Sequence, residues 1–162
     1  MPRPGDFGLS PGGGPLMAAV RLGTLSRYGH ACICSNTTTL GNIGGMVEII
    51  EAYPGGCRKR RASVDEFTWS NIDLSDTQRN GVVDYTHDTL GLPYDWRAIA
   101  GFLARFWWAK ATNGSGDHAD DKLICSELVV WAYREGAKLD LAPGRAPGDV
   151  SPGDLADYLV RN

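Results

Sequence analysis

Apolar and polar residues alternate through much of the first half of the chain, as they do in strands with one buried face. The segment GHACICS places His30, Cys32 and Cys34 on one face of such a strand, with apolar residues between them. A short strand is also predicted at Phe7, directly after the turn PGD. The longer predicted strands are residues 29–35, 46–53 and 57–64, the last two joined by the turn Pro54-Gly55-Gly56.

Apolar residues three and four positions apart, which indicate helices, prevail in the second half. Asp95 is suited to cap one helix, and Gly136 is suited to end another. A polar loop at residues 113–121 separates these two. The predicted helices are residues 15–25, 75–90, 96–107, 123–136 and a last one opened by Ser151. Strands gathered ahead of most of the helices favour an α+β fold.

The composition fits a single domain over residues 1–162. Of the 162 residues, 43% are apolar and 22% are charged, which is ordinary for a chain that buries a core. The 16 basic and 19 acidic residues leave a net charge of −3. Nucleic-acid-binding domains usually carry a basic excess, so no nucleic-acid partner is expected.

The sequence contains no apolar run long enough to span a bilayer, and its first residues lack the apolar core of a secretory signal. We therefore expect no transmembrane segment and synthesis in a reducing cytoplasm. An extracellular target would require delivery in a phage particle or non-classical export. Four cysteines are too few for a disulfide scaffold of this length, so they are predicted to be thiols.

Cys125 and His30 are the candidates for nucleophilic chemistry. Cys125 lies near the start of an apolar helix, where the positive helix end favours a thiolate. The alternative is a buried structural thiol, the commoner fate of cysteine. His30 follows Gly29 at a strand start, and histidine is the usual base that keeps such a thiol ionised. His87 and His118 compete with it from a predicted helix and a polar loop.

A carboxylate that orients the histidine would complete the set. Glu48 and Glu51 both lie on the strand predicted to pair with the His30 strand. Their odd separation places them on opposite faces, so only one of them faces the histidine. Parity alone leaves both possibilities open.

These residues, taken in order along the chain, resemble the circularly permuted branch of the NlpC-type papain-like cysteine hydrolases. The matching segments are PGDFGL, RYGHACI, VEIIEAY, GLPYDW, ICSELVVWAY and SPGDLADYL. In unpermuted relatives the catalytic cysteine precedes the histidine, whereas here His30 precedes Cys125 by 95 residues.

The resemblance implies a small, bent antiparallel sheet or half-barrel packed against helices. It implies Cys125 as nucleophile, His30 as general base and Glu51, from the Glu-Ala pair, as the third residue. The reaction would be acyl transfer through a thioester, with the Cys125 amide as an oxyanion donor and no cofactor. Tyr28, Tyr94 and Trp96 are candidates for substrate binding.

The first substrate expectation is an amide bond in peptidoglycan peptides. A lipid ester or amide, cleaved or transferred, is the alternative, because permuted relatives also resemble the lecithin:retinol acyltransferase group. Aromatic residues between Trp96 and Trp108 would favour lipid. A non-catalytic structural or binding module of a larger assembly, such as a phage particle, is the third possibility.

Two further patterns have alternative interpretations. His30, Cys32 and Cys34, closed by Cys57, would supply four metal ligands, although alternating strand residues suit a tetrahedron poorly. The loop residues Asp117, His118, Asp120 and Asp121 lack the spacing of a calcium site. The basic run at residues 58–61 predicts either a solvated edge strand or a grip on an anionic substrate.

Overall fold

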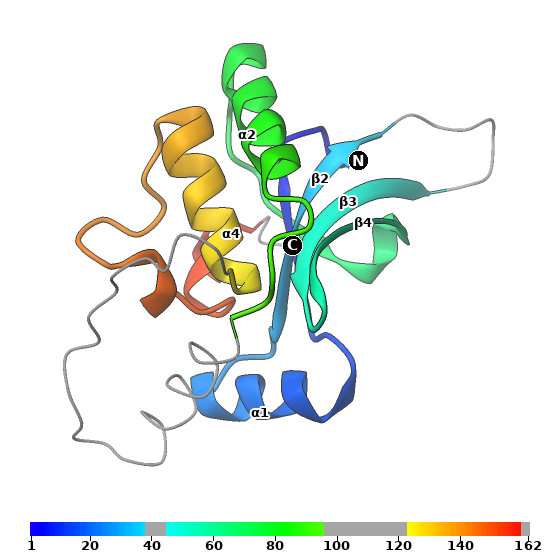
Figure 1. Cartoon of the computed structure of the whole chain (residues 1–162), viewed down its shortest axis with the longest axis vertical. Coiled ribbons are helices and arrows are strands. Elements are labelled where there is room, and N and C mark those ends of the chain that lie inside the picture. Colours follow the sequence, from blue (N-terminus) through cyan, green and yellow to red (C-terminus); the bar gives the residue numbers. More distant parts are fainter. Residues whose placement is uncertain (38–44, 96–122, 160–162) are drawn as a thin grey trace.

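The chain forms an α+β fold around one five-stranded antiparallel sheet (Figure 1). The computed structural model describes residues 1–37, 45–95 and 123–159. The strand order is β4-β3-β2-β1-β5, so the pairing is consecutive apart from the late addition of β5. The strands are β1 Phe7–Ser10, β2 His30–Asn36, β3 Met46–Tyr53, β4 Gly56–Ser63 and β5 Thr68–Trp69.

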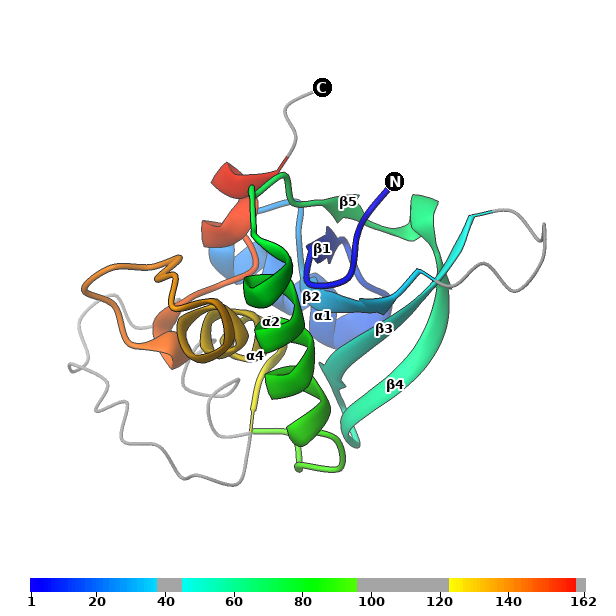
Figure 2. The ribbon, with the colours of Figure 1, turned by 90° about the horizontal axis from the view of Figure 1, so that it is seen from above.

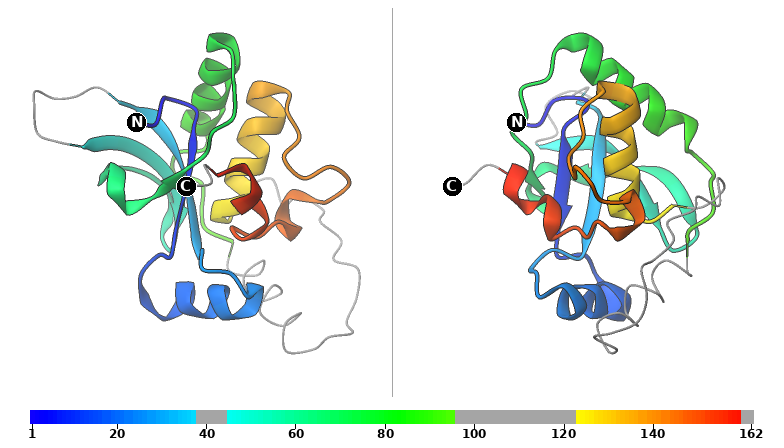
Figure 3. Two further views of the ribbon diagram at one scale, coloured as in Figure 1. Left: turned by 180° about the vertical axis from the view of Figure 1, so that it is seen from behind. Right: turned by 90° about the vertical axis from the view of Figure 1, so that its left-hand side faces the viewer.

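Two helices cover one side of the sheet, and a third lies across one of its ends (Figures 1 and 3). Helices α2 and α4 lie side by side over the sheet, as the view from above also shows (Figure 2). The α-helices of the described residues are α1 Gly14–Thr24, α2 Asp76–Asp88 and α4 Cys125–Trp131. Helix α4 continues as a π-helical segment, Ala132–Ala137, and shorter 3-10 turns occur at Val64–Glu66, Pro147–Asp149 and Asp154–Tyr158.

The alternation along β2 places its side chains in two separate cores. Ala31 and Ile33 face the helices and pack with residues of α2 and α4. Cys32 and Cys34 face the other way and pack with apolar residues of β3, β4 and the segment that follows. Both faces of β2 are therefore buried, and the strand is held rigidly in the middle of the sheet.

The strand and helix predictions for the described residues are confirmed to within about two residues, with two exceptions in the last third. The helix predicted from residue 123 begins at Cys125 and changes to π-helical spacing at Ala132. The helix predicted from Ser151 is a 3-10 helix that begins at Asp154. The predicted helix at 96–107 and the polar loop at 113–121 lie outside the described residues.

No helix among the described residues has both the length and the apolar character needed to cross a membrane.

Candidate functional site

The site begins with a histidine fixed at the first residue of β2. His30 is only 3% exposed. Gly29 precedes it in a place where a Cβ would lie 2.7 Å from the carbonyl oxygen of Pro11 and 2.8 Å from that of Met17. Any larger residue would push β2 away from these backbones, so the glycine is needed to hold His30 in this position.

Glu51 is the carboxylate that faces this histidine. Its Oε2 atom lies 2.8 Å from His30 Nε2, and its side chain is fully buried. Glu48 is on the opposite face of β3, where its carboxylate meets Ser35 Oγ at 3.2 Å and Lys59 Nζ at 3.3 Å. The structure thus decides between the two glutamates that parity left open.

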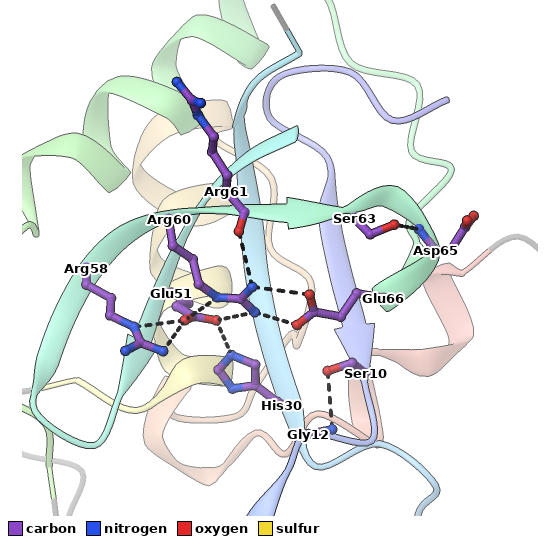
Figure 4. A network of polar contacts seen from close by, with 10 residues as sticks. All are labelled: Ser10, Gly12, His30, Glu51, Arg58, Arg60, Arg61, Ser63, Asp65 and Glu66. Atoms are coloured by element: carbon purple, nitrogen blue, oxygen red, sulfur yellow. Dashed lines mark hydrogen bonds and ion pairs between the residues drawn. The ribbon is translucent and has the colours of Figure 1, made fainter. Parts of the chain in front are cut away.

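Two arginines of β4 bind the same carboxylate (Figure 4). Arg58 donates from Nε and Nη2 to Glu51 Oε1, at 3.0 and 2.8 Å. Arg60 donates from Nε to the same oxygen at 2.9 Å, and its outer nitrogens bind Glu66. Burial by itself raises the pKa of Glu51, but hydrogen bonds from His30, Arg60 and Arg58 outweigh it and lower the pKa to about 2. Glu51 is therefore a stable anion.

This role of the arginines was not predicted from the sequence, although strand alternation places Arg58 and Arg60 on one face. The signal was present in the hairpin: the tight turn at Pro54-Gly55 pairs Tyr53 with Gly56, and counting back pairs Glu51 with Arg58. The prediction of an edge strand is correct, because β4 ends the sheet. Arg58 and Arg60, however, bind a buried carboxylate rather than forming a purely solvated face.

Cys125 is the first residue of α4 and is 4% exposed. The first amides of a helix have no partner within the helix, so the Cys125 N–H is left for another acceptor. Ile124 supplies the N-cap position, and its own amide donates to Glu127 Oε2 at 3.4 Å. Sulfur and amide therefore sit together at the start of the helix.

The pKa of His30 depends on both of its neighbours, Cys125 and Glu51. Burial by itself lowers the pKa of His30, but the influence of the neighbouring Cys125 side chain and then of Glu51 raises it to about 9. The Nε2 atom is taken by Glu51, and His30 Nδ1 is buried with no conventional hydrogen-bond partner among the described residues. The Tyr53 ring meets the imidazole edge-on, at 5.7 Å between centroids. The imidazole is thus held between a carboxylate and a thiol.

A small, largely apolar pocket, partly open to solvent, adjoins Cys125. It lies where α1, the start of β2 and the start of α4 come together. Its lining residues are Val20, Gly29, Tyr94, Ile124, Cys125, Ser126, Ser151 and Pro152. The pocket therefore leaves a small apolar space beside Cys125.

The structure describes two of the three predicted substrate-binding residues, Tyr28 and Tyr94. Tyr94 is buried and lines the pocket; burial and then Cys125 raise its pKa. Tyr28 is buried in the same core as Cys125, and its hydroxyl has no hydrogen-bond partner among the described residues. Trp96 lies outside the described residues, as do His118 and the other aromatic residues up to Trp108. His87 is exposed on α2 and does not contribute.

The other three cysteines are buried, and burial raises the pKa of each thiol. All four cysteines are free thiols, as predicted. Burial raises the pKa of Cys34 to about 12 and of Cys57 to about 11, and it raises that of Cys32 well above the usual value for a thiol. Cys57 pairs with Ala52 and so faces the helix side of the sheet, away from Cys32 and Cys34. These residues therefore do not surround a common point.

Comparison with known proteins gives a fold and no family. No family model and no curated protein matches the chain. Among solved structures it is similar to the metalloprotein yiiX of Escherichia coli O157:H7, with a TM-score of 0.61 and 18% identity over 86% of this chain and 69% of that one. Likeness at this identity shows a shared fold alone. Within residues 1–37, 45–95 and 123–159, no three His, Cys, Asp or Glu side chains are grouped so as to hold a metal ion.

Proposed function

We propose that the chain is a cysteine hydrolase of the circularly permuted papain-like type, cleaving an amide bond through an acyl-enzyme. Cys125 is the nucleophile, His30 the general base and acid, and Glu51 the residue that orients the imidazole. The observation that carries the proposal is the buried histidine with a carboxylate on Nε2 and a cysteine thiol as its other neighbour. That order of groups is the one that activates a thiol for acyl transfer.

The chain order supports the permuted form of the fold. The strands that carry His30 and Glu51 precede the helix that begins with Cys125. The nucleophile helix α4 lies against β2 although it follows all the strands in the sequence (Figure 3).

In the proposed reaction, the thiolate of Cys125 attacks the substrate carbonyl carbon, and the oxyanion accepts a hydrogen bond from the Cys125 amide. The carbon–nitrogen bond then breaks, and the proton on His30 passes to the leaving amine. A water molecule next gives a proton to His30 and attacks the thioester carbon. The carbon–sulfur bond breaks, which releases the carboxylic acid product and restores the thiolate and imidazolium.

We propose an amide in peptidoglycan peptides as the substrate. The pocket beside the sulfur supports an acyl part with a small side chain, since its lining is largely apolar and its volume is limited. The same apolar lining favours a second candidate, an acyl chain presented as a lipid ester or amide, which the enzyme would cleave or transfer.

The test is turnover of a substrate panel by purified protein, with stem-peptide amides in one set and acyl esters and amides in the other. We expect one set to be cleaved and Cys125→Ser to reduce that turnover at least about 1,000-fold. Cys57→Ser is the matched control, because it makes the same change at a buried thiol in a different core cluster from Cys125. Turnover that survives Cys125→Ser would contradict the proposal, and a folded protein inactive on the whole panel would favour a non-catalytic module.

A further inference from the structure

We propose that Arg58 and Arg60 are positioning residues that hold Glu51 ionised and aimed at His30, so that β4 sets the pH range in which Cys125 is reactive. This inference rests on the proposed function. It extends the site to a strand that contributes no group to the bond-breaking steps.

Arg58 contacts both residues that hold the imidazole. Its guanidinium donates two hydrogen bonds to Glu51 and lies 4.3 Å from the centroid of the Tyr53 ring. Tyr53 in turn meets His30 edge-on. One side chain on β4 thus restrains both the carboxylate bound to the imidazole and the Tyr53 ring, although half of that side chain is exposed.

Arg60 links Glu51 to the surface. It bonds to Glu51 Oε1 at 2.9 Å and to Glu66 Oε2 at 3.2 Å, so two carboxylates fix the plane of its guanidinium. The Glu66 side chain is 42% exposed, whereas the Glu51 side chain is 1% exposed. A buried carboxylate needs several donors to stay ionised, and the two arginines supply three of the hydrogen bonds to Oε1.

The charged and titratable groups around Glu51 determine how the His30–Glu51 pair responds to pH. The charged or titratable neighbours are His30 and Cys32 from β2, Tyr53 from β3, Arg58 and Arg60 from β4, Glu66 through Arg60, and Cys125 with Tyr94 beyond His30. Removing the arginines leaves burial less opposed, which favours a protonated Glu51. A protonated Glu51 no longer stabilises the imidazolium, and Cys125 loses the cation that favours its thiolate.

The same strand provides matched controls. Lys59 and Arg61 alternate with the two arginines and therefore point to the opposite face of β4. Lys59 binds Glu48, and Arg61 is exposed. Replacing Arg60 and replacing Arg61 make the same chemical change one residue apart, on opposite faces of the strand.

The experiment measures the rate of Cys125 alkylation by iodoacetamide from pH 4 to 9, by mass spectrometry. The proteins are the wild type, Arg58→Met, Arg60→Met, the double variant and the controls Lys59→Met and Arg61→Met. We expect the midpoint of the acid arm to move up by about one pH unit in the double variant, an approximately tenfold slower rate on that arm. The single variants should move it less, and the controls should leave it in place.

Thermal unfolding checks that each variant is folded, and Arg58→Met, whose side chain is half exposed, carries the test if the double variant does not fold. A fast wild-type thiol with the same midpoint in Arg58→Met and Arg61→Met overturns the positioning role alone. A wild-type Cys125 no faster than the other cysteines overturns the proposed function and the positioning role together.

Discussion

A carboxylate buried as deeply as Glu51 is stable only because each of its oxygens has a charged partner. His30 and Arg60 reach Oε2, while Arg58 and Arg60 share Oε1. Leaving such a charge without partners is one of the costliest single changes in a protein interior. The site therefore has consequences for stability as well as for chemistry, and both depend on pH.

We predict that the thermal unfolding midpoint depends on pH in two separate ranges. The pKa of Glu51 falls from 4.5 to about 2 on folding, so its stabilisation is complete above pH 4.5 and is lost as the pH falls toward 2. The pKa of His30 rises from 6.5 to about 9, so its stabilisation is complete below pH 6.5 and is lost as the pH rises toward 9.

Calorimetry of the wild type, Glu51→Gln and His30→Ala between pH 2 and 10 checks this. The difference between the wild type and Glu51→Gln should shrink on the acid side, and that between the wild type and His30→Ala on the alkaline side. Differences that stay constant over the whole range would contradict the pKa shifts.

At the scale of elements, the site depends on how closely α2 and the extension of α4 approach each other. They cross at Gly81 and Gly136, where a Cβ on Gly81 would lie 2.2 Å from the Gly136 carbonyl oxygen. Alanine normally favours a helix over glycine by about 1 kcal/mol. Here the absence of a Cβ on both glycines lets the two backbones come into contact. This contact fixes the position of the helix that begins with Cys125.

We predict that Gly81→Ala lowers the free energy of unfolding by about 1–3 kcal/mol, because the added methyl overpacks the crossing by more than helix propensity returns. Gly13→Ala is the control, since its Cβ meets no atom within 4 Å, and it should cost less than about 1 kcal/mol. Urea titration measures both. A Gly81→Ala variant as stable as the wild type would show that the crossing is less tight than described.

The elements that follow from local pattern could be predicted, and those that depend on register could not. Alternation identified β2 and β3, and the spacing of apolar residues identified α2. Strand parity alone did not choose between Glu51 and Glu48, because that choice depends on how β3 pairs with β2. The role of Arg58 depends on the register of β3 with β4, for which the hairpin turn was the only signal. The change to π-helical spacing at Ala132 occurs where α4 meets α2, and local sequence carried no signal for it.

At the scale of the whole molecule, a buried ion pair joins the residue just before β1 to helix α2. Arg79 on α2 binds Asp6 Oδ1 at 2.7 Å and the carbonyl oxygen of Pro4 at 3.0 Å. Asp6 also accepts a hydrogen bond from the Arg3 amide. Both charged side chains are less than a tenth exposed, so the pair connects two elements 73 residues apart in the sequence.

We predict that Arg79→Met lowers the free energy of unfolding by about 3 kcal/mol or more, because it leaves Asp6 charged and buried. The exposed pair of Lys138 with Glu135 is the control, and Lys138→Met should change stability by less than about 0.5 kcal/mol. Chemical denaturation of both variants measures these changes in the free energy of unfolding. Equal effects would mean that Arg79 contributes no more than a surface charge.

The central claim, a thiol activated by His30, is tested most directly by competition among the four cysteines of one molecule. The native protein is treated with limiting iodoacetamide at about pH 6, where an ordinary thiol is almost wholly protonated, and the label is mapped by mass spectrometry. We predict rapid labelling of Cys125 alone in the wild type, and loss of that selectivity in His30→Ala. Equal or slower labelling of Cys125 relative to Cys32, Cys34 and Cys57, or the same selectivity in His30→Ala, would contradict the account.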